Sequence, residues 1–336
     1  MATPSQLTSS SWAPFRIEPK FSLRVWGYQD LRPWYEMVSE SGEPIGEAWL
    51  TGDECVVWSG AQAGKILRSL FAENSQALLG KTGAAGASPL LIKVIFAKEK
   101  LSVQVHPDDK MAQKYGEPRG KTECWYALEA EPGAQVACGL KPGVTLEKVK
   151  TGIDEGTLEN SLNIVDVEAG DMIFVDAGTV HAIWPGSILL ETQQNCDLTY
   201  RMYDYGRGRE LHIAKSLEAT RLETRAGRVP AKVLADRTIL MDGDFFRVER
   251  IPVTGSRASG SLPCEDEPVP GLAYLFVSRG AARIAGEGFA ALEVPTGGIV
   301  AVPAASPEFT VEDLNEAGSS RLELMRISPR WPKAQR

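Results

Sequence analysis

The chain has 336 residues, of which 43% are hydrophobic and 24% are charged, a composition that is typical of soluble globular proteins and excludes general disorder. Its 44 acidic side chains outnumber its 36 basic ones, and the formal net charge of −8 disfavours nucleic acid as a partner. No segment reaches the roughly 20 uninterrupted apolar residues of a membrane helix, and the N-terminus lacks the apolar run of a signal peptide, so we expect a cytoplasmic protein without a membrane partner.

Short apolar runs dominate the chain after residues 1–20, a segment rich in Ser, Thr and Pro that we expect to be an N-terminal tail or a strand-edge extension. These runs, separated by Gly, Pro, Asp and Asn, predict strands over residues 90–97, 101–106, 171–175, 188–192, 245–251 and 272–277. Helical spacing predicts helices over residues 62–72, 107–115 and 210–221. Because helices do not alternate regularly with strands, the pattern favours sandwiches or barrels over a doubly wound parallel sheet.

Two segments, residues 170–181 and 297–308, match each other without gaps. Each reads as a glycine turn, a buried strand and a tight turn. We interpret the match as two related β-domains that join near residues 225–240, and the alternative is a chance similarity of short segments. The first copy ends in His181, whereas the second ends in Glu308 and no histidine follows it. We therefore expect the second domain to bind no metal.

Polar side chains gather on one face of the expected strand over residues 101–106. Strict alternation places Ser102, Gln104 and His106 on this face and three apolar side chains on the other. Buried polar side chains need a partner, and a metal ion or a hydroxylated ligand would provide one.

Further candidate ligands follow along the chain. Lys121 and Glu123 lie two residues apart in an extended segment, again on one face, and His181 follows a tight turn. Together with Gln104 and His106 they offer an amide, two imidazoles and a carboxylate, a set that suits a divalent transition metal and most often zinc. A set without thiolate that leaves positions for substrate indicates a catalytic site. The alternative is that the histidines are only hydrogen-bonded to polar neighbours.

Helix ends explain three other candidates better than metal binding does. His212 lies off the apolar stripe of the helix expected over residues 210–221, so we expect it at the surface or as a cap. Asp108 and Asp109 are expected to start the helix over residues 107–115.

Five blocks of the sequence, in order, resemble the type I mannose-6-phosphate isomerases (phosphomannose isomerases) of the cupin superfamily, especially their short bacterial class. The blocks are residues 89–93, 101–109, 120–126, 178–183 and 191–207, and weaker similarities occur at residues 26–27, 46–49 and 209–213. The resemblance implies a mainly β fold of two cupin-like jelly-roll domains with a few short helices. On this basis we expect a catalytic metal-binding cupin domain over residues 21–235 and a second, degenerate cupin domain without metal over residues 236–330.

The resemblance also implies a reaction and a site. It implies an aldose–ketose isomerase that interconverts mannose 6-phosphate and fructose 6-phosphate through a cis-enediol, as a monomer or homodimer with one Zn²⁺ per chain. The matching metal ligands are Gln104, His106, Glu123 and His181. The matching catalytic residues are Arg201, Lys121 and Glu191, and the matching contacts with the phosphorylated hexose are Lys93, Ser102 and Arg207.

The residue types suit this chemistry. Arg201 is always charged and can stabilise the oxyanion of an enediol without giving up a proton. Lys121 is a candidate proton shuttle, because a nearby dication lowers the pKa of a lysine. Glu191 and a metal-bound water are rival bases, and the sequence does not decide among the three.

One position departs from the family pattern. Asp176 stands where these isomerases usually have proline before the turn that leads to His181. It either alters the turn that orients His181 or hydrogen-bonds its own backbone.

Two other functions remain open from the sequence. An Fe(II) oxygenase on a cupin fold also uses two histidines and a carboxylate, but the positive charge of Lys121, Arg201 and Arg207 suits a sugar phosphate better than dioxygen chemistry. A non-catalytic sugar-phosphate-binding cupin would keep the metal without turnover.

Overall fold

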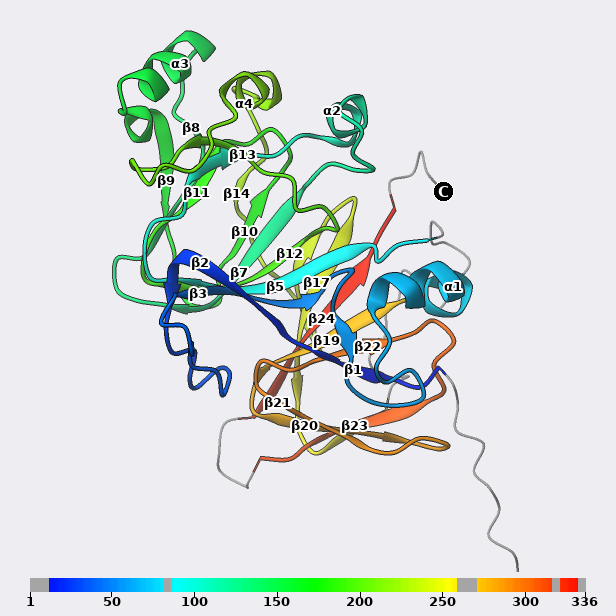
Figure 1. The fold of residues 1–336 in the computed structure, drawn as a ribbon. Helices are drawn as coiled ribbons and strands as arrows, with labels where there is room; N and C mark the ends of the chain where they lie inside the picture. Colours follow the sequence, from blue (N-terminus) through cyan, green and yellow to red (C-terminus); the bar gives the residue numbers. More distant parts are fainter. Residues whose placement is uncertain (1–11, 81–85, 259–270, 316–320, 332–336) are drawn as a thin grey trace, which may run out of the picture. The chain divides into compact units, whose positions relative to one another are not determined.

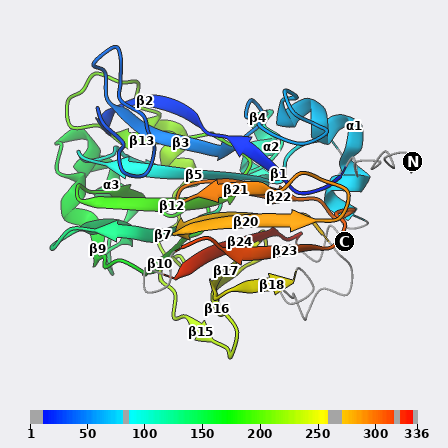
Figure 2. The same ribbon diagram turned by 90° about the horizontal axis from the view of Figure 1, so that it is seen from below.

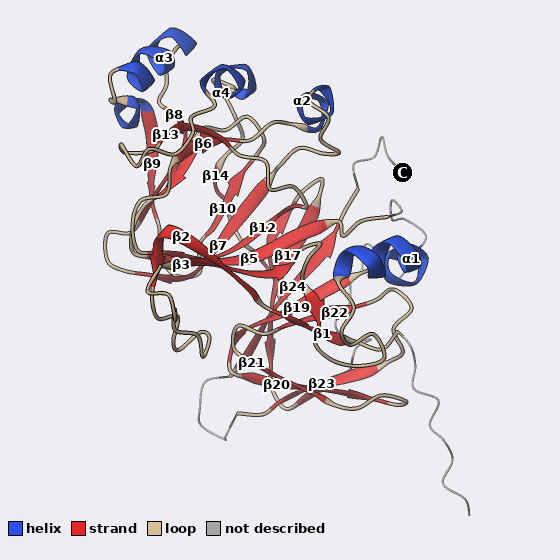
Figure 3. Cartoon of the chain, in the orientation of Figure 1, coloured by secondary structure: helices blue, strands red, loops and turns tan. Residues whose placement is uncertain are grey.

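The computed structural model describes residues 12–80, 86–258, 271–315 and 321–331 (Figure 1). In these residues the chain is mainly β, with antiparallel sheets and short helices (Figure 3). The helices are α1 (Leu67–Leu79), α2 (Asp109–Lys114), α3 (Leu146–Asp154) and α4 (Ile213–Ala219). None of these described helices is long and apolar enough to cross a membrane.

The chain forms two compact units. Unit 1 consists of residues 1–20, 50–89 and 232–336, and unit 2 consists of residues 21–49 and 90–231. Each unit is built from one large and one small antiparallel sheet. The prediction of a mainly β fold with two cupin-like jelly-roll domains and a few short helices is confirmed.

Unit 2 contains a seven-stranded and a five-stranded sheet. The seven-stranded sheet has the order β14 (Gly227–Arg228), β10 (Met172–Val175), β7 (Glu123–Ala130), β12 (Ser187–Gln194), β5 (Leu90–Ala97), β3 (Ile45–Thr51) and β2 (Lys20–Tyr28). The five-stranded sheet has the order β13 (Tyr200–Tyr203), β6 (Val103–Val105), β11 (His181–Ile183), β8 (Gln135–Leu140) and β9 (Leu162–Asp166). A core that includes Ile95, Trp125 and Ile183 joins the two sheets. A second core, with Val103 and Val105, joins the five-stranded sheet to α3 and α4.

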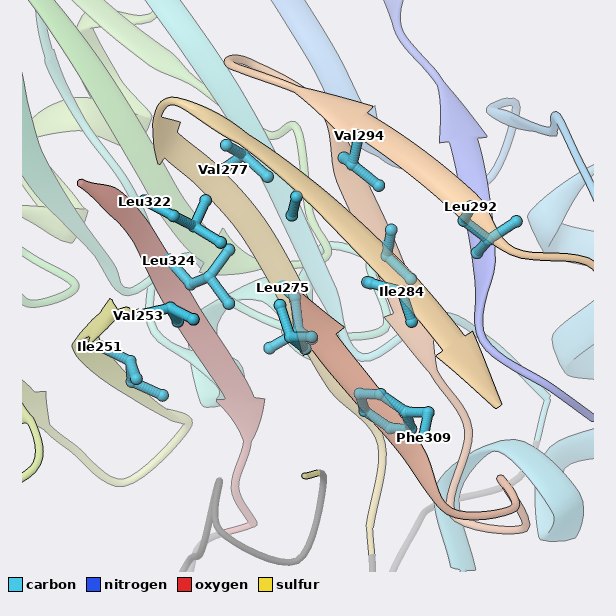
Figure 4. Packing of buried hydrophobic residues seen from close by; sticks show 13 residues of the cluster. Ile251, Val253, Leu275, Val277, Ile284, Leu292, Val294, Phe309, Leu322 and Leu324 are labelled. Carbon is cyan, nitrogen blue, oxygen red and sulfur yellow. The ribbon is translucent and has the colours of Figure 1, made fainter. Parts of the chain in front are cut away.

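Unit 1 contains an eight-stranded and a four-stranded sheet. The eight-stranded sheet has the order β15 (Lys232–Val233), β16 (Thr238–Asp242), β17 (Phe246–Val253), β24 (Leu322–Pro329), β19 (Ala273–Arg279), β22 (Ile299–Val302), β1 (Phe15–Glu18) and β4 (Val56–Val57). The four-stranded sheet has the order β18 (Ser256–Ala258), β23 (Phe309–Asp313), β20 (Ala281–Gly286) and β21 (Leu292–Pro295). Apolar side chains of both sheets, among them Leu275, Leu324 and Phe309, form the core shown in Figure 4.

The two units share one strand topology. The order β10, β7, β12, β5, β3, β2 of unit 2 corresponds strand by strand to the order β22, β19, β24, β17, β16, β15 of unit 1. The gapless sequence match of residues 170–181 with 297–308 places β10 on β22, the corresponding strand. The correspondence supports two related β-domains rather than a chance similarity.

The correspondence extends to a cross-strand ion pair. On β5 and β12, Lys93 lies opposite Glu191 in the register. On β17 and β24, the strands that correspond to them, Glu249 lies opposite Arg326, with 3.9 Å between the charged groups. Glu249 also accepts a 3.0 Å hydrogen bond from Arg237. Each unit thus holds a cross-strand pair of opposite charges, with the signs exchanged between the strands.

The described residues of the N-terminal segment favour the strand-edge extension over the tail. Phe15–Glu18 forms β1, which pairs with β22 and β4 inside the sheet of unit 1, and Figures 1 and 2 show it in blue beside the orange β22. Alternating Phe15 and Ile17 are each only 2% exposed. Residues 50–89 likewise belong to unit 1, not to the predicted domain over residues 21–235. Such boundaries escape sequence reasoning because the partner strands come from opposite ends of the chain.

Most predicted elements are present with shifted ends. α2 and α4 lie inside the helices predicted over residues 107–115 and 210–221, whereas α1 begins and ends later than the predicted helix over residues 62–72. The strand predicted over residues 101–106 is only Val103–Val105. α3 is missing from the prediction, although Thr145 caps it by accepting a hydrogen bond from the Lys148 backbone.

We expect truncation of Leu324 in the core of unit 1 to destabilise the protein strongly. Leu324 is fully buried between the sheets, so Leu324→Ala should lower the free energy of unfolding by about 2–5 kcal/mol. Leu314→Ala is the matched control, because that side chain is 42% exposed and its loss should change the free energy by about 0.5 kcal/mol or less. Urea unfolding measures both, and equal midpoints would contradict the assigned core.

Candidate metal and substrate site

Three buried side chains from different segments of unit 2 meet at one point. Glu123 begins β7, His181 begins β11, and His106 directly follows β6. Their potential ligand atoms all lie within 4.8 Å of one another. The predicted convergence of two imidazoles and a carboxylate is therefore present among the described residues.

Backbone carbonyls orient both imidazoles. Nδ1 of His106 donates to the Leu198 carbonyl at 2.9 Å, and Nδ1 of His181 donates to the Thr179 carbonyl at 2.9 Å. These bonds leave each Nε2 facing Glu123, at 3.6 Å from His106 and 3.4 Å from His181. Among the described residues, Nε2 of His106 has no hydrogen-bond partner. Two lone pairs and a carboxylate aimed at one point are the arrangement that a bound cation requires.

The pKa shifts of the three side chains also fit a bound divalent metal ion. Burial lowers the pKa of His181 to about 4 and the pKa of His106 well below its usual value, so both rings are neutral at pH 7. Burial raises the pKa of Glu123 to about 8, although Lys121 opposes the shift. Neutral imidazoles are the form that binds metal, and a divalent cation would stabilise the buried carboxylate. The donor set therefore fits a divalent metal ion.

Gln104 lies beside this cluster. It is paired with His181 in the register of β6 and β11, and its Nε2 lies 3.2 Å from Nε2 of His181. Its Oε1 accepts from the Ser102 hydroxyl at 3.4 Å. An oxygen ligand would require the opposite orientation of the amide, which a rotation about the last side-chain bond provides. Gln104 as the fourth ligand stays a prediction.

Lysines neutralise the buried carboxylates of the site. Lys121 Nζ lies 3.1 Å from Oε2 of Glu123, and Lys93 Nζ lies 2.8 Å from Oε2 of Glu191. Glu191 also accepts a 3.1 Å hydrogen bond from the Trp125 indole. Burial would raise the pKa of Glu191, but Lys93 and Lys121 outweigh it and lower the pKa to about 2. Glu191 is thus ionised at neutral pH.

The pKa of Lys121 is set by burial and by its carboxylate neighbours. Burial would lower it, but the charges of Glu123 and Glu191 raise it above its usual value. Lys121 is therefore an ammonium group in this structure. Its carboxylate partners decide its charge state here.

Glu47 and Arg24 belong to the same charge network, and the sequence analysis missed both. Glu47 on β3 is 5% exposed, and its Oε1 lies 3.1 Å from Lys93. Its Oε2 lies 2.7 Å from Arg24 on β2 and accepts from the Trp49 indole at 3.0 Å. The weak sequence similarity at residues 26–27 and 46–49 is the signal that could have found this pair.

A pocket of about 410 Å³ opens beside the network. Its described lining includes six of the residues that the sequence singles out: Lys93, Ser102, Gln104, Lys121, Glu191 and Arg201. Arg201 extends from β13, where it is paired with Gln104, and its NH1 donates to the Glu210 carbonyl at 2.9 Å. The pocket is therefore the candidate substrate site.

Arg207 is not brought to this pocket. Its NH1 donates to the Lys100 carbonyl at 2.7 Å, and its guanidinium lies over the Tyr205 ring, 5.4 Å from the centroid. Arg209, two residues further on, lines the pocket instead. The contact of Arg207 with the substrate stays a prediction, because no substrate is placed in the pocket.

The remaining candidates take structural roles. Asp108 caps α2 by accepting a 2.8 Å hydrogen bond from the Met111 backbone, as predicted. His212 is the residue before α4, and its Nδ1 accepts from the Arg201 backbone at 3.3 Å. Asp176 accepts a 2.9 Å hydrogen bond from the Thr179 hydroxyl and so closes the turn that leads to His181.

Comparisons with known proteins agree with this geometry. Residues 15–138 match the model of the type I phosphomannose isomerase catalytic domain. A mannose-6-phosphate isomerase of Streptococcus mutans is 34% identical over 258 residues, which cover 72% of this chain and 80% of that protein. The solved mannose 6-phosphate isomerase of Bacillus subtilis superposes with a TM-score of 0.80 at 29% identity, over 94% of this chain and 99% of that one. A solved mannose 6-phosphate isomerase bound with zinc and yttrium shares the fold, with a TM-score of 0.72 at 16% identity over 96% of this chain and 100% of that one.

We expect the metal content of the purified protein to depend on His181 and not on His212. His181→Ala removes one of the converging donors and should lower the bound divalent metal to a small fraction of the wild-type amount. His212→Ala is the matched control, because that ring lies outside the cluster and the variant should keep the wild-type content. Elemental analysis after dialysis measures both. Equal metal in the two variants would show that the ion, if any, binds elsewhere.

Proposed function

Because the chain belongs to the type I phosphomannose isomerases, which are aldose–ketose isomerases, we propose that it interconverts mannose 6-phosphate and fructose 6-phosphate through a cis-enediol, with one zinc ion per chain. The observation that carries the proposal is the His106, Glu123 and His181 cluster beside a pocket rich in positive charge. The zinc in a solved enzyme of the same fold supports the choice of ion. We place the enzyme in the cytoplasm, as a monomer or homodimer, with a small phosphorylated hexose as its substrate.

Four residues would hold the zinc ion: Gln104, His106, Glu123 and His181. When bound, zinc supplies a Lewis acid for the oxygens at the first two carbons of the sugar. The hydrogen bonds of both Nδ1 atoms to backbone carbonyls keep the imidazoles in the tautomer that this role requires.

Arg201 is proposed to stabilise the developing oxyanion of the enediol. Its guanidinium lines the pocket, and its Nε is buried and has no hydrogen-bond partner among the described residues. A permanently charged donor of this kind stabilises negative charge in the transition state without exchanging a proton.

Glu191 and Lys121 are proposed to carry the proton between the two carbons. Glu191 is ionised because Lys93 and Lys121 lower its pKa, so its carboxylate can accept a proton. Lys121 is protonated beside Glu123 and can donate one from Nζ. Both side chains line the pocket, and Lys93 and Ser102 are proposed to contact the sugar from the same wall. Kinetics of separate Glu191 and Lys121 variants would decide which of these two side chains takes the proton from carbon.

We expect the purified protein to convert mannose 6-phosphate to fructose 6-phosphate and to incorporate solvent deuterium at C2 of the sugar in deuterium oxide. Proton exchange with solvent is the signature of an enediol, which a protein that only binds the sugar does not form. A chelator should remove both activities, and added zinc should restore them. Nuclear magnetic resonance follows the exchange and a coupled assay follows the turnover. Turnover that survives complete zinc removal would refute the zinc-dependent reaction, and iron as the native ion would favour a cupin oxygenase.

We expect Arg201→Ala to keep the wild-type metal content and to lower kcat by a factor of about 10²–10³, the usual loss when one oxyanion-stabilising donor is removed. Arg225→Ala is the matched control, because Arg225 is an exposed arginine outside the pocket and its loss should leave kcat unchanged. Steady-state kinetics and elemental analysis check both variants. An Arg201→Ala enzyme with wild-type kcat would contradict the assigned role.

A further inference from the structure

The pocket carries the opposite sign of charge from the protein as a whole. Its described lining includes five cationic side chains and three acidic ones, in a chain of net charge −8. The acidic ones are Glu47, Glu191 and Asp197. Cationic side chains therefore outnumber acidic ones by two among the lining residues, and guanidinium and ammonium groups facing a pocket attract a phosphate group, which carries between one and two negative charges near neutral pH.

Four of the five cations pair with buried carboxylates, and the two lysines are the most deeply buried of them. Lys93 lies within 3.1 Å of both Glu47 and Glu191, and Lys121 lies 3.1 Å from Glu123. The side chains of Lys93 and Lys121 are only 4% and 3% exposed, so removing either from its partner would leave a charge uncompensated in the interior. Arg24 and Arg209 also pair with buried carboxylates, Glu47 and Asp204, but their guanidinium groups stay partly exposed to the pocket, and among the described residues Arg201 forms no ion pair.

These three are arginines that come together from different segments. Arg24 lies on β2, Arg201 on β13, and Arg209 follows β13. Burial lowers the pKa of Arg201, and Arg209 and Arg24 lower it further, although the carboxylates of Asp204 and Glu210 oppose the shift. Mutual repulsion of this kind is relieved when an anion binds among the guanidinium groups.

The arginines also offer hydrogen-bond donors to a ligand. Nε of Arg201 is buried without a partner among the described residues. Arg209 is fixed by the buried Asp204, which accepts from its Nε at 2.7 Å, and no described residue accepts from its NH1. The side chains of Arg24 and Arg209 are 31% and 28% exposed, so both can be reached from the pocket.

We propose that Arg24 and Arg209, together with Arg201, bind the phosphate group of the substrate. This inference rests on the proposed function and assigns the phosphate end of the same pocket. A guanidinium group matches two phosphate oxygens at once, which a lysine does not. Arg207, the residue that the sequence points to, is held by the Lys100 carbonyl outside the described lining and takes no part.

The assignment separates two functions of the arginines. Arg24 and Arg209 supply binding energy remote from the reacting carbons and position the sugar chain, whereas Arg201 also serves the oxyanion. Loss of a residue that binds substrate and transition state equally raises KM with little change in kcat. Replacing Arg24 or Arg209 should therefore mainly raise KM, whereas replacing Arg201 should also lower kcat.

The test is calorimetric binding of sorbitol 6-phosphate, a substrate analogue without a carbonyl, to the zinc-loaded enzyme and its variants. We expect Arg209→Gln and Arg24→Gln each to weaken binding by about 10- to 100-fold, the effect of losing hydrogen bonds to a charged group. Arg209→Lys and Arg24→Lys should restore part of the affinity, because the charge remains. Arg225→Gln, outside the pocket, should bind as the wild type does. Sorbitol without phosphate should bind weakly and equally to all variants.

Kinetics with mannose 6-phosphate provide the second measurement. Arg209→Gln should raise KM by about 10- to 100-fold and lower kcat less than threefold. Inorganic phosphate should compete with substrate in the wild type and lose this effect in the Arg24→Gln and Arg209→Gln variants, which shows that the phosphate group itself is recognised.

Two results would overturn the inference. One is wild-type affinity of both Gln variants for sorbitol 6-phosphate in an enzyme that is active, since the proposed function would then stand without this phosphate site. The other is a larger loss for Arg207→Gln than for Arg209→Gln, which would return the phosphate to Arg207. A wild-type protein that binds sorbitol 6-phosphate through these arginines but shows no turnover would instead refute the proposed function and leave the binding site intact.

Discussion

Carboxylates inside a protein are stable as anions only beside positive charge, and this constraint governs the interior of unit 2. Lys93 bridges Glu47 and Glu191, while Glu123 has Lys121 and two neutral imidazoles around it. Glu123 is therefore the group whose charge is least compensated, and its raised pKa reports this deficit. A divalent cation at that point would complete the balance. The lysines, the metal site and the cationic pocket all follow from the need to keep these carboxylates ionised.

The sheet geometry explains how such a site coexists with an apolar core. Along β5, β7 and β12, alternate side chains share the inner face, so Lys93, Glu123 and Glu191 are each followed or preceded two residues away by an apolar partner of the core. One end of the sandwich holds the charged residues of the candidate site, and the rest holds the apolar core. This division lets the fold tolerate buried charge without losing its core.

The centre of the site could be predicted from the sequence because its residues carry local signals. Gln104 and His106 share one face of a short strand, and Glu123 and His181 belong to segments with glycine turns before them. The residues around this centre could not be predicted from the sequence, because their positions depend on pairings between distant segments. Arg24 and Glu47 join the network only through β2 and β3, and the course of a loop places Arg209 in the described pocket lining. For the same reason the sequence does not decide between a tail and a strand-edge extension for β1, since its partner β22 comes from the other end of the chain.

The reversed ion pair of the second unit places a constraint on how these sequences can change. Lys93 faces Glu191 in one sandwich, and Glu249 faces Arg326 in the other, supported by Arg237. Reversing the sign of either pair by single replacements passes through a chain with two like charges buried opposite each other. Exchanging the cation and the carboxylate between the two strands of a pair therefore passes through a less stable protein. The exchanged signs are for that reason a durable mark of divergence between the two halves, independent of any ligand that either half binds.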